Sequence, residues 1–133
     1  MGTFDAIGIA GSGMSVYRTW LDAISDNLAN LNTVRSTDEE AFRARFVHAS
    51  SVDYGEPAGA TVDGIALGSA EGRLVYEPDN PLADGEGYVR YPDIDMSSQM
   101  TYLIMAQRAY QANASVAERA RASYETALQI GRA

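Results

Sequence analysis

The chain has no cysteine, no lysine and a single histidine, His48, among its 133 residues. Without cysteine it has no disulfide, no thiolate nucleophile and no cysteine-ligated metal. A zinc site or a Ser–His–Asp arrangement would have to be built around His48 alone, so we expect no catalytic residues, no metal site and no cofactor. Arginine supplies all ten basic side chains, and the net charge of −8 argues against binding nucleic acid or an anionic membrane surface.

Long apolar runs are also absent. No stretch approaches 18 apolar residues, so we expect no direct membrane insertion. The first residues, Met1–Asp5, carry no basic region, which argues against a usual secretory signal peptide. If the protein leaves the cytoplasm, we expect another route to carry it.

Glycine is missing from residues 93–130, and Pro92 is the last proline. Small or apolar residues recur there at steps of three and four, with Asn113 filling one gap: Leu103, Ala106, Tyr110, Ala117, Ala120, Tyr124 and Ala127. This period predicts a helix of about 34 residues, roughly 50 Å long, with Gly131 at its C-cap. So short a chain cannot cover both sides of such a helix, so another partner must pack on it.

The N-terminal segment has a second stripe with the same spacing: Ile7, Ala10, Met14, Tyr17, Leu21, Ile24, Leu28 and Leu31. Gly8, Gly11 and Gly13 weaken the start of this predicted helix by about 1 kcal/mol each relative to alanine. The asparagine-rich cluster 27–33 predicts its C-terminal end, because asparagine tolerates left-handed backbone and its amide bonds exposed carbonyls.

The middle segment has a period of two instead. Phe42 and Phe46 alternate with Arg43 and Arg45, which predicts a strand over residues 41–49. Shorter strands are expected at 61–67, 73–76 and 87–91, separated by turns at 56–59, 78–81 and 84–87. Residues 38–95 carry a net charge of −9, while the flanks carry +1. We therefore predict an α+β fold, in which long N- and C-terminal helices pair as a hairpin or coiled coil around a small antiparallel β-rich middle.

Three local motifs suggest ligands, and each has a simpler interpretation. Residues 8–15 are glycine-rich like a phosphate loop, but their spacing is not G-x-G-x-x-G and no lysine exists for a P-loop. The acidic stretch 79–86 lacks the ligand spacing of a calcium loop and favours a hairpin turn. Asn113-Ala-Ser115 matches a glycosylation acceptor but lies on the inner stripe, where an asparagine more often sets helix register.

These features predict a non-enzymatic assembly protein. We expect its assembly interface on the two stripes and their asparagines, at Ile7, Met14, Tyr17, Leu21, Ile24, Asn27, Leu28, Asn30, Leu103, Tyr110, Asn113, Ala117, Tyr124 and Leu128. The competing class is a soluble helical adaptor, or export-associated protein, that binds a partner helix in a groove. An enzyme that uses the glycine-rich stretch is a distant third.

Motifs along nearly the whole chain also carry a family resemblance. They lie at residues 4–6, 12–14, 27–33, 76–81, 84–92, 108–113 and 127–132. The cluster Asn27-Leu-Ala-Asn30-Leu-Asn32-Thr33 resembles axial proteins of rod and hook generally, whereas the Gly87-Tyr-Val stretch and the Ile-Gly-Arg ending are narrower. Together they resemble bacterial flagellar basal-body rod proteins, most closely those of the proximal rod.

The resemblance implies a structural subunit of the basal-body rod. Residues 1–35 and 93–133 would form one helical core domain that lines the inner tube, with the β-rich segment 36–92 facing outward. The implied partners are further copies of the chain, other rod proteins, basal-body ring components and the flagellar type III export apparatus, which would export it without a cleaved signal peptide. Where similar chains often carry glycine and proline, this chain has Ser36–Ala41, so we expect a more helical linker over residues 34–41.

Overall fold

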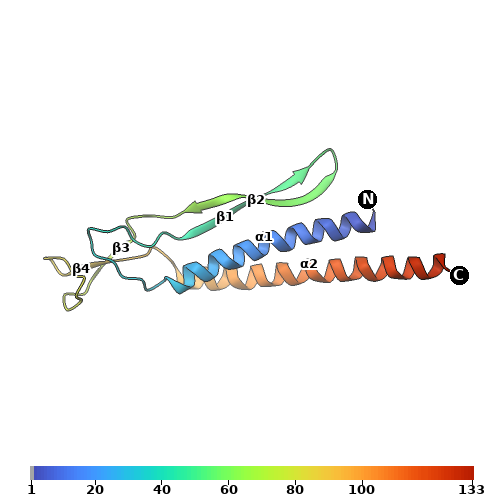
Figure 1. Ribbon diagram of the computed structural model, residues 1–133. Coiled ribbons are helices and arrows are strands. Elements are labelled where there is room, and N and C mark those ends of the chain that lie inside the picture. The colour runs from blue at the N-terminus through green and yellow to red at the C-terminus, as the bar shows by residue number, and fades with distance from the viewer. Residues whose placement is uncertain (1) are drawn as a thin grey trace. The chain divides into compact units, whose positions relative to one another are not determined.

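The computed structural model describes residues 2–133 and confirms the α+β fold (Figure 1). Its elements follow in the order α1 (Thr3–Ala29), β1 (Arg45–Asp53), β2 (Pro57–Leu67), β3 (Arg73–Tyr76), β4 (Tyr88–Tyr91) and α2 (Met96–Gly131). The strands form two separate two-stranded sheets, β1–β2 and β3–β4. In the part of the chain that the structure describes, neither helix is long and apolar enough to cross a membrane.

The chain packs as two compact units, each built from both helices and one part of the β segment. The terminal unit comprises Met1–Leu21, His48–Gly64 and Ile104–Ala133. The central unit comprises Asp22–Val47 and Ile65–Leu103. The division into segments 1–35, 36–92 and 93–133 follows secondary structure rather than packing, and as a domain assignment it stays a prediction.

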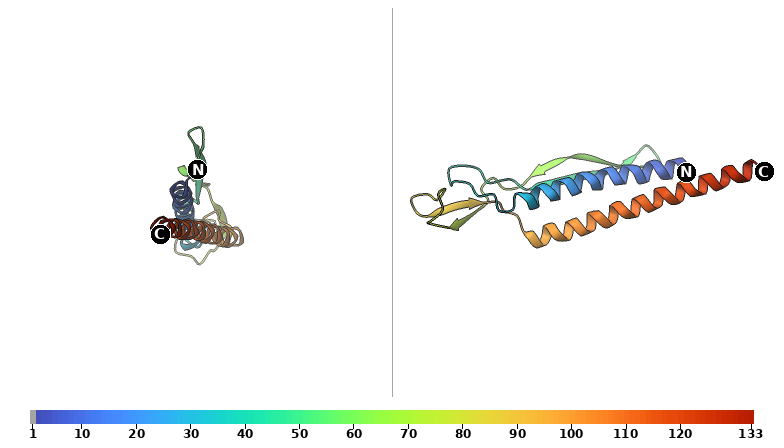
Figure 2. Two further views of the ribbon diagram at one scale, coloured as in Figure 1. Left: turned by 90° about the vertical axis from the view of Figure 1, so that its right-hand side faces the viewer. Right: turned by 60° about the horizontal axis from the view of Figure 1, so that its bottom comes forward.

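In the terminal unit, α1 runs antiparallel to α2 on one side and lies beside the β1–β2 hairpin on the other (Figures 1 and 2). The rings of Phe4 and Tyr124 meet edge to face with centroids 4.6 Å apart. The backbone N–H of Ala60 on β2 donates to Ser12 Oγ on α1 at 3.0 Å. Among the described hydrophobic residues of this unit, Ala10 and Ala106 alone are fully buried, so its core is thin.

The central unit holds most of the core. Its buried apolar residues come from the end of α1, the segment before β1, strand β4 and the segment before α2: Ala23, Ile24, Ala41, Ala44, Val89, Pro92 and Ile94. Strands β3 and β4 pair antiparallel with Arg73 opposite Tyr91 and Tyr76 opposite Tyr88. The Tyr76 and Tyr88 rings then meet edge to face, as expected for a cross-strand aromatic pair.

The expectation of a helical linker over residues 34–41 is wrong. Arg35 and Arg90 exchange two backbone hydrogen bonds of 2.8 and 2.9 Å. The Arg90 guanidinium also donates to the carbonyl of Thr37 at 2.7 Å and to that of Glu71. These bonds fix Arg35 and Thr37 in place, and the bond from Glu39 N–H to the carbonyl of Ser36 closes a single turn, so the linker forms no helix.

Two predicted element boundaries also need correction. The strand expected at residues 41–49 begins only at Arg45, and the buried residues before it are Ala41 and Ala44, while Phe46 is exposed. Residues 41–44 are instead held by backbone bonds from Ala41 N–H to Ala70 and from Gly68 N–H to Ala44. The C-terminal helix, expected within the glycine-free stretch from residue 93, starts at Met96. The Asp95 carboxylate caps it by accepting from Ser98 N–H at 3.0 Å.

Candidate assembly surfaces

His48 is exposed on β1, and the described residues contain no group of three or more side chains that could hold a metal ion. The glycine-rich stretch 8–15 lies inside α1, not in a loop. Its backbone N–H groups therefore serve the helix rather than a phosphate.

Two carboxylates of the acidic turn between β3 and β4, those of Glu77 and Asp84, accept hydrogen bonds from within the hairpin. Glu77 accepts from Asn80 Nδ2 at 2.9 Å and from the Tyr91 hydroxyl at 2.8 Å, and these bonds lower the pKa of Glu77. Asp84 accepts from the N–H groups of Tyr88 and Glu86, each at 2.9 Å, and the bond from Tyr88 does most to lower its pKa. The predicted hairpin turn is confirmed, and its carboxylates stabilise the turn.

The interface residues expected on α1 lie on its packed side. Ile24 and Asn27 are buried, and the others are half-buried: Ile7, Met14, Tyr17, Leu21, Leu28 and, just beyond the helix, Asn30. On α2, Leu103, Tyr110, Asn113, Ala117 and Tyr124 are half-buried, whereas Leu128 is 45% exposed. Within one chain the α2 stripe thus ends at Tyr124, and the assignment of all these positions to an assembly interface stays a prediction.

The buried side chain of Asn27 links separate segments of the central unit by hydrogen bonds. This side chain is 1% exposed and joins three elements. Nδ2 donates to the carbonyl of Arg45 at 3.0 Å and to Gln99 Oε1 at 3.1 Å, and Oδ1 accepts from Arg45 N–H at 2.8 Å. The amide therefore ties the end of α1 to the start of β1 and the start of α2.

The other asparagines of the two stripes act locally. Asn30 Nδ2 donates to the carbonyl of Asp26 at 2.9 Å, and Asn30 Oδ1 accepts from the Thr33 hydroxyl at 3.1 Å, which closes the end of α1 as predicted. Asn113 Nδ2 donates to the carbonyl of Ala109 on its own helix at 2.9 Å.

Gly13 has a packing role rather than the phosphate role considered above. A Cβ atom built on Gly13 would lie 2.8 Å from Asn113 Oδ1, so α1 and α2 approach closely here. Gly8 and Gly11 meet nothing within 4 Å in the same chain. The close approach of α2 thus explains Gly13, whereas no contact within the chain explains Gly8 or Gly11.

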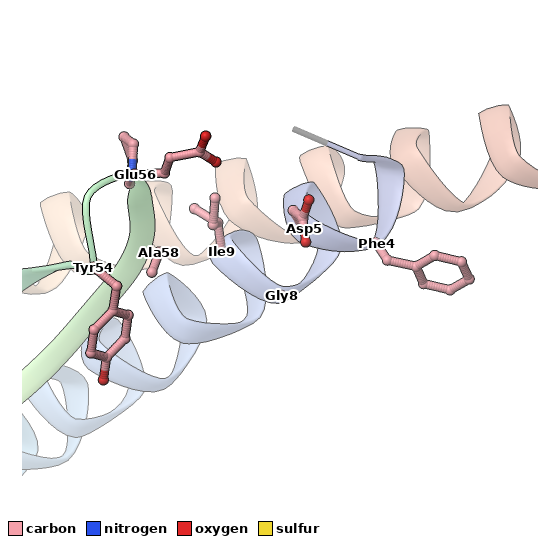
Figure 3. A pocket seen from close by; sticks show the side chains of 8 residues that line it. Phe4, Asp5, Gly8, Ile9, Tyr54, Glu56 and Ala58 are labelled. Atoms are coloured by element: carbon pink, nitrogen blue, oxygen red, sulfur yellow. The ribbon is translucent and has the colours of Figure 1, made fainter.

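A surface that the sequence pattern did not reveal lies between the start of α1 and the tip of the β1–β2 hairpin (Figure 3). This tip groove has a volume of about 490 Å³ and is lined by Phe4, Asp5, Gly8, Ile9, Tyr54, Glu56, Pro57 and Ala58. Gly59, at φ +124°, lies so close to α1 that a Cβ would be 2.3 Å from Ser12 Oγ. The contact joins residues 47 positions apart, which no local period predicts.

Comparison with known proteins agrees with the helical ends of the chain. Residues 7–35 match the family model of the flagella basal body rod protein, and residues 86–130 match that of the flagellar basal body rod FlgEFG protein C-terminal region. The flagellar basal-body rod protein FlgC of Yersinia enterocolitica is 35% identical over 98% of this chain and 99% of its own length. Those of Salmonella typhimurium and Bacillus subtilis are 32% and 27% identical, each covering at least 98% of both chains.

The matches span both helices and continue through the β segment, and they agree with a fold that offers helical packing surfaces. The chain therefore belongs to the FlgC family of flagellar basal-body rod proteins, and it is a structural subunit of the rod.

Proposed function

We propose that this chain assembles through α1 and α2, which pack against further copies and against other rod proteins, and that it acts without catalysis. The half-buried residues predicted on the two stripes, together with the outward side of α2, form the contact surface, while Ile24 and Asn27, which are buried within the chain, support it from inside. Contacts to basal-body ring components and passage through the flagellar type III export apparatus without a cleaved signal belong to the same proposal. Head-to-tail contacts that do not close into a ring generate a helical filament.

The thin core of the terminal unit carries this proposal. Each helix buries one alanine fully in this unit, yet α2 leaves large apolar side chains exposed, at Ile104, Met105, Val116, Leu128 and Ile130. Burying a side chain of this size is worth roughly 1.5–3 kcal/mol. Met105, Val116 and Ile130 fall on one side of α2 at 100° per residue, and exposed apolar side chains that share a side are typical of an interaction surface.

The test is made in the native bacterium and compares two sets of variants. The seam variants change residues on the packed stripes of α1 and α2, and the outer variants change exposed residues of the acidic segment. Ile24→Asp or Leu103→Asp puts a charge on the packed stripe, where the apolar contact is lost and the charge must be desolvated. These changes are expected to abolish rod formation and swimming. Asp63→Ala and Glu71→Ala change exposed side chains of the acidic segment, where single changes usually stay within about 0.5 kcal/mol, and should do little.

Swimming diameter and the yield of this chain in isolated basal bodies are the two measurements. If the outer changes disable the rod and the seam changes are tolerated, the acidic segment is the working surface and the helical assignment fails. A soluble adaptor, the competing hypothesis, would be missing from basal bodies of the unmodified strain.

A further inference from the structure

The tip groove is a built feature of the terminal unit. Hydrogen bonding between Ser12 and Ala60 and the close approach of Gly59 hold the hairpin against α1 directly beside it. Ile9, Pro57 and Ala58 supply apolar surface inside the groove, and the side chains of Phe4 and Tyr54 extend outward at its two ends (Figure 3). The Tyr54 side chain is 88% exposed, although it is large and apolar for most of its length.

The same groove is acidic. Asp5 and Glu56 line it, and the hairpin segment His48–Gly64 carries three carboxylates and no arginine. Asp5 accepts from Gly2 N–H and Asp53 from Gly55 N–H, and neither carboxylate has an ion-pair partner in the described part of the chain. None of the ion pairs found among residues 2–133 involves the groove or the hairpin tip.

One face of α2 has the opposite character. Met105, Arg108, Ala112, Val116 and Arg119 follow one another at steps of three and four and form one stripe, the outer stripe. Met105 and Val116 are 53% and 50% exposed. Neither arginine has an ion-pair partner in the described part of the chain, whereas Arg121 pairs with Glu125 on the side of α2 roughly opposite the outer stripe.

The outer stripe does not reach the groove of its own chain. At 100° per residue it lies roughly opposite the α2 stripe that faces α1, which contains Ala106, Tyr110 and Ala117. The groove lies on the far side of α1, between α1 and the hairpin. A complementary partner for either surface must therefore come from another molecule.

We propose that the tip groove of one copy receives the outer stripe of α2 from a second copy. Met105 and Val116 would lie among Phe4, Ile9, Tyr54 and Pro57, while Arg108 and Arg119 would face Glu56 and Asp53. This inference rests on the proposed function, and it specifies one of the contacts by which copies pack together. Because the two surfaces differ, the contact is head to tail and propagates from copy to copy.

Crosslinking between copies tests the contact directly, since the chain contains no native cysteine. Glu56→Cys combined with Arg119→Cys is introduced in the native bacterium, and isolated basal bodies are treated with a short bis-maleimide reagent. We expect a ladder of dimers and higher multimers of this chain on a denaturing gel. Each single-cysteine variant, and Glu56→Cys combined with Glu118→Cys on another face of α2, should stay monomeric.

The outcomes separate this inference from the proposed function. If the chain is present in basal bodies but the Glu56–Arg119 variant gives no ladder, or the Glu118 control gives an equal one, the contact is overturned. A crosslink to a different protein overturns the second copy as the occupant. If the unmodified chain is absent from basal bodies, the proposed function itself fails and the contact fails with it.

Reversing the charges on the outer stripe and on the tip groove gives a second test. It remains decisive if the cysteine variant does not assemble. Arg108→Glu with Arg119→Glu should reduce the swimming diameter more than twofold, and adding Asp53→Arg with Glu56→Arg should recover most of it. Arg121→Glu, which reverses a charge on the side of α2 roughly opposite the outer stripe, should leave swimming nearly unchanged. Failure of the added pair to restore swimming, or equal damage by Arg121→Glu, would overturn the contact.

Discussion

Replacing Asn27 by alanine should be the most damaging single truncation in the asparagine-rich cluster. The change removes three hydrogen bonds at once and leaves Gln99 Oε1, Arg45 N–H and Arg45 C=O without their partner. Unsatisfied buried groups cost roughly 1–3 kcal/mol each. Arg45 lies at an exposed position, where water replaces part of the loss, but Gln99 is buried. We therefore expect a loss of about 2–4 kcal/mol, a large share of the roughly 5–15 kcal/mol that stabilises a domain.

Urea unfolding of the purified chain measures this loss, with hydrogen exchange over residues 22–47 as a local readout. Asn32→Ala is the matched control, because Asn32 is exposed and its side chain makes no hydrogen bond within residues 2–133. It should cost less than about 0.5 kcal/mol. Equal unfolding midpoints for the Asn27 and Asn32 variants would refute the reasoning that the buried amide joins α1, β1 and α2.

Three further predictions use other parts of the molecule. Hydrogen bonds lower the pKa of Glu77, Asp84 and Asp95 from ordinary values of 4.5 and 3.8. Their stabilisation should be complete above those values and decline as pH falls through the lowered ones, so urea midpoints measured between neutral pH and pH 3 should fall on acidification, and less so in Glu77→Gln. Gly11→Ala should increase the helix content measured by circular dichroism, because the new Cβ meets no other atom. Gly13→Ala should loosen the contact with Asn113 and so lower the hydrogen-exchange protection of the helices in assembled rods. Millimolar nucleotide should not raise the melting temperature, since a ligand that binds only the folded state must stabilise it; a clear rise that Gly13→Val abolishes would revive the phosphate-loop hypothesis.

Periodicity predicted the helices well because each stripe repeats over many turns. From Leu103 to Tyr124 the predicted small and apolar residues are the less exposed ones, and the end of α1 falls within the asparagine-rich cluster. The spacing of a stripe does not show where a single chain stops covering it. Leu128 is therefore among the predicted interface residues, although it is exposed in the single chain. A repeat marks which residues share a face and leaves open what covers that face.

Contacts between distant residues were beyond local reasoning. The alternation of Phe42 and Phe46 indicated a strand from residue 41, but β1 begins at Arg45, and Ala41 and Ala44 instead bond to Ala70 and Gly68, just beyond the end of β2. The linker is held by Arg90, more than 50 residues away, which donates to the carbonyl of Thr37. Asn27 could be recognised as a polar residue at a helix end, yet its partner Gln99 lies 72 positions further along the chain.

Hydrogen exchange compared between the free chain and isolated basal bodies tests the central claim, that assembly covers the two helices. In the free chain the central unit should be protected, while residues 3–21 and 104–131 exchange quickly, because their thin core leaves the apolar stripes without enough partners. In basal bodies both helical stretches should become strongly protected. Equally strong protection of both stretches in the free monomer would contradict the account and indicate a self-contained helical bundle.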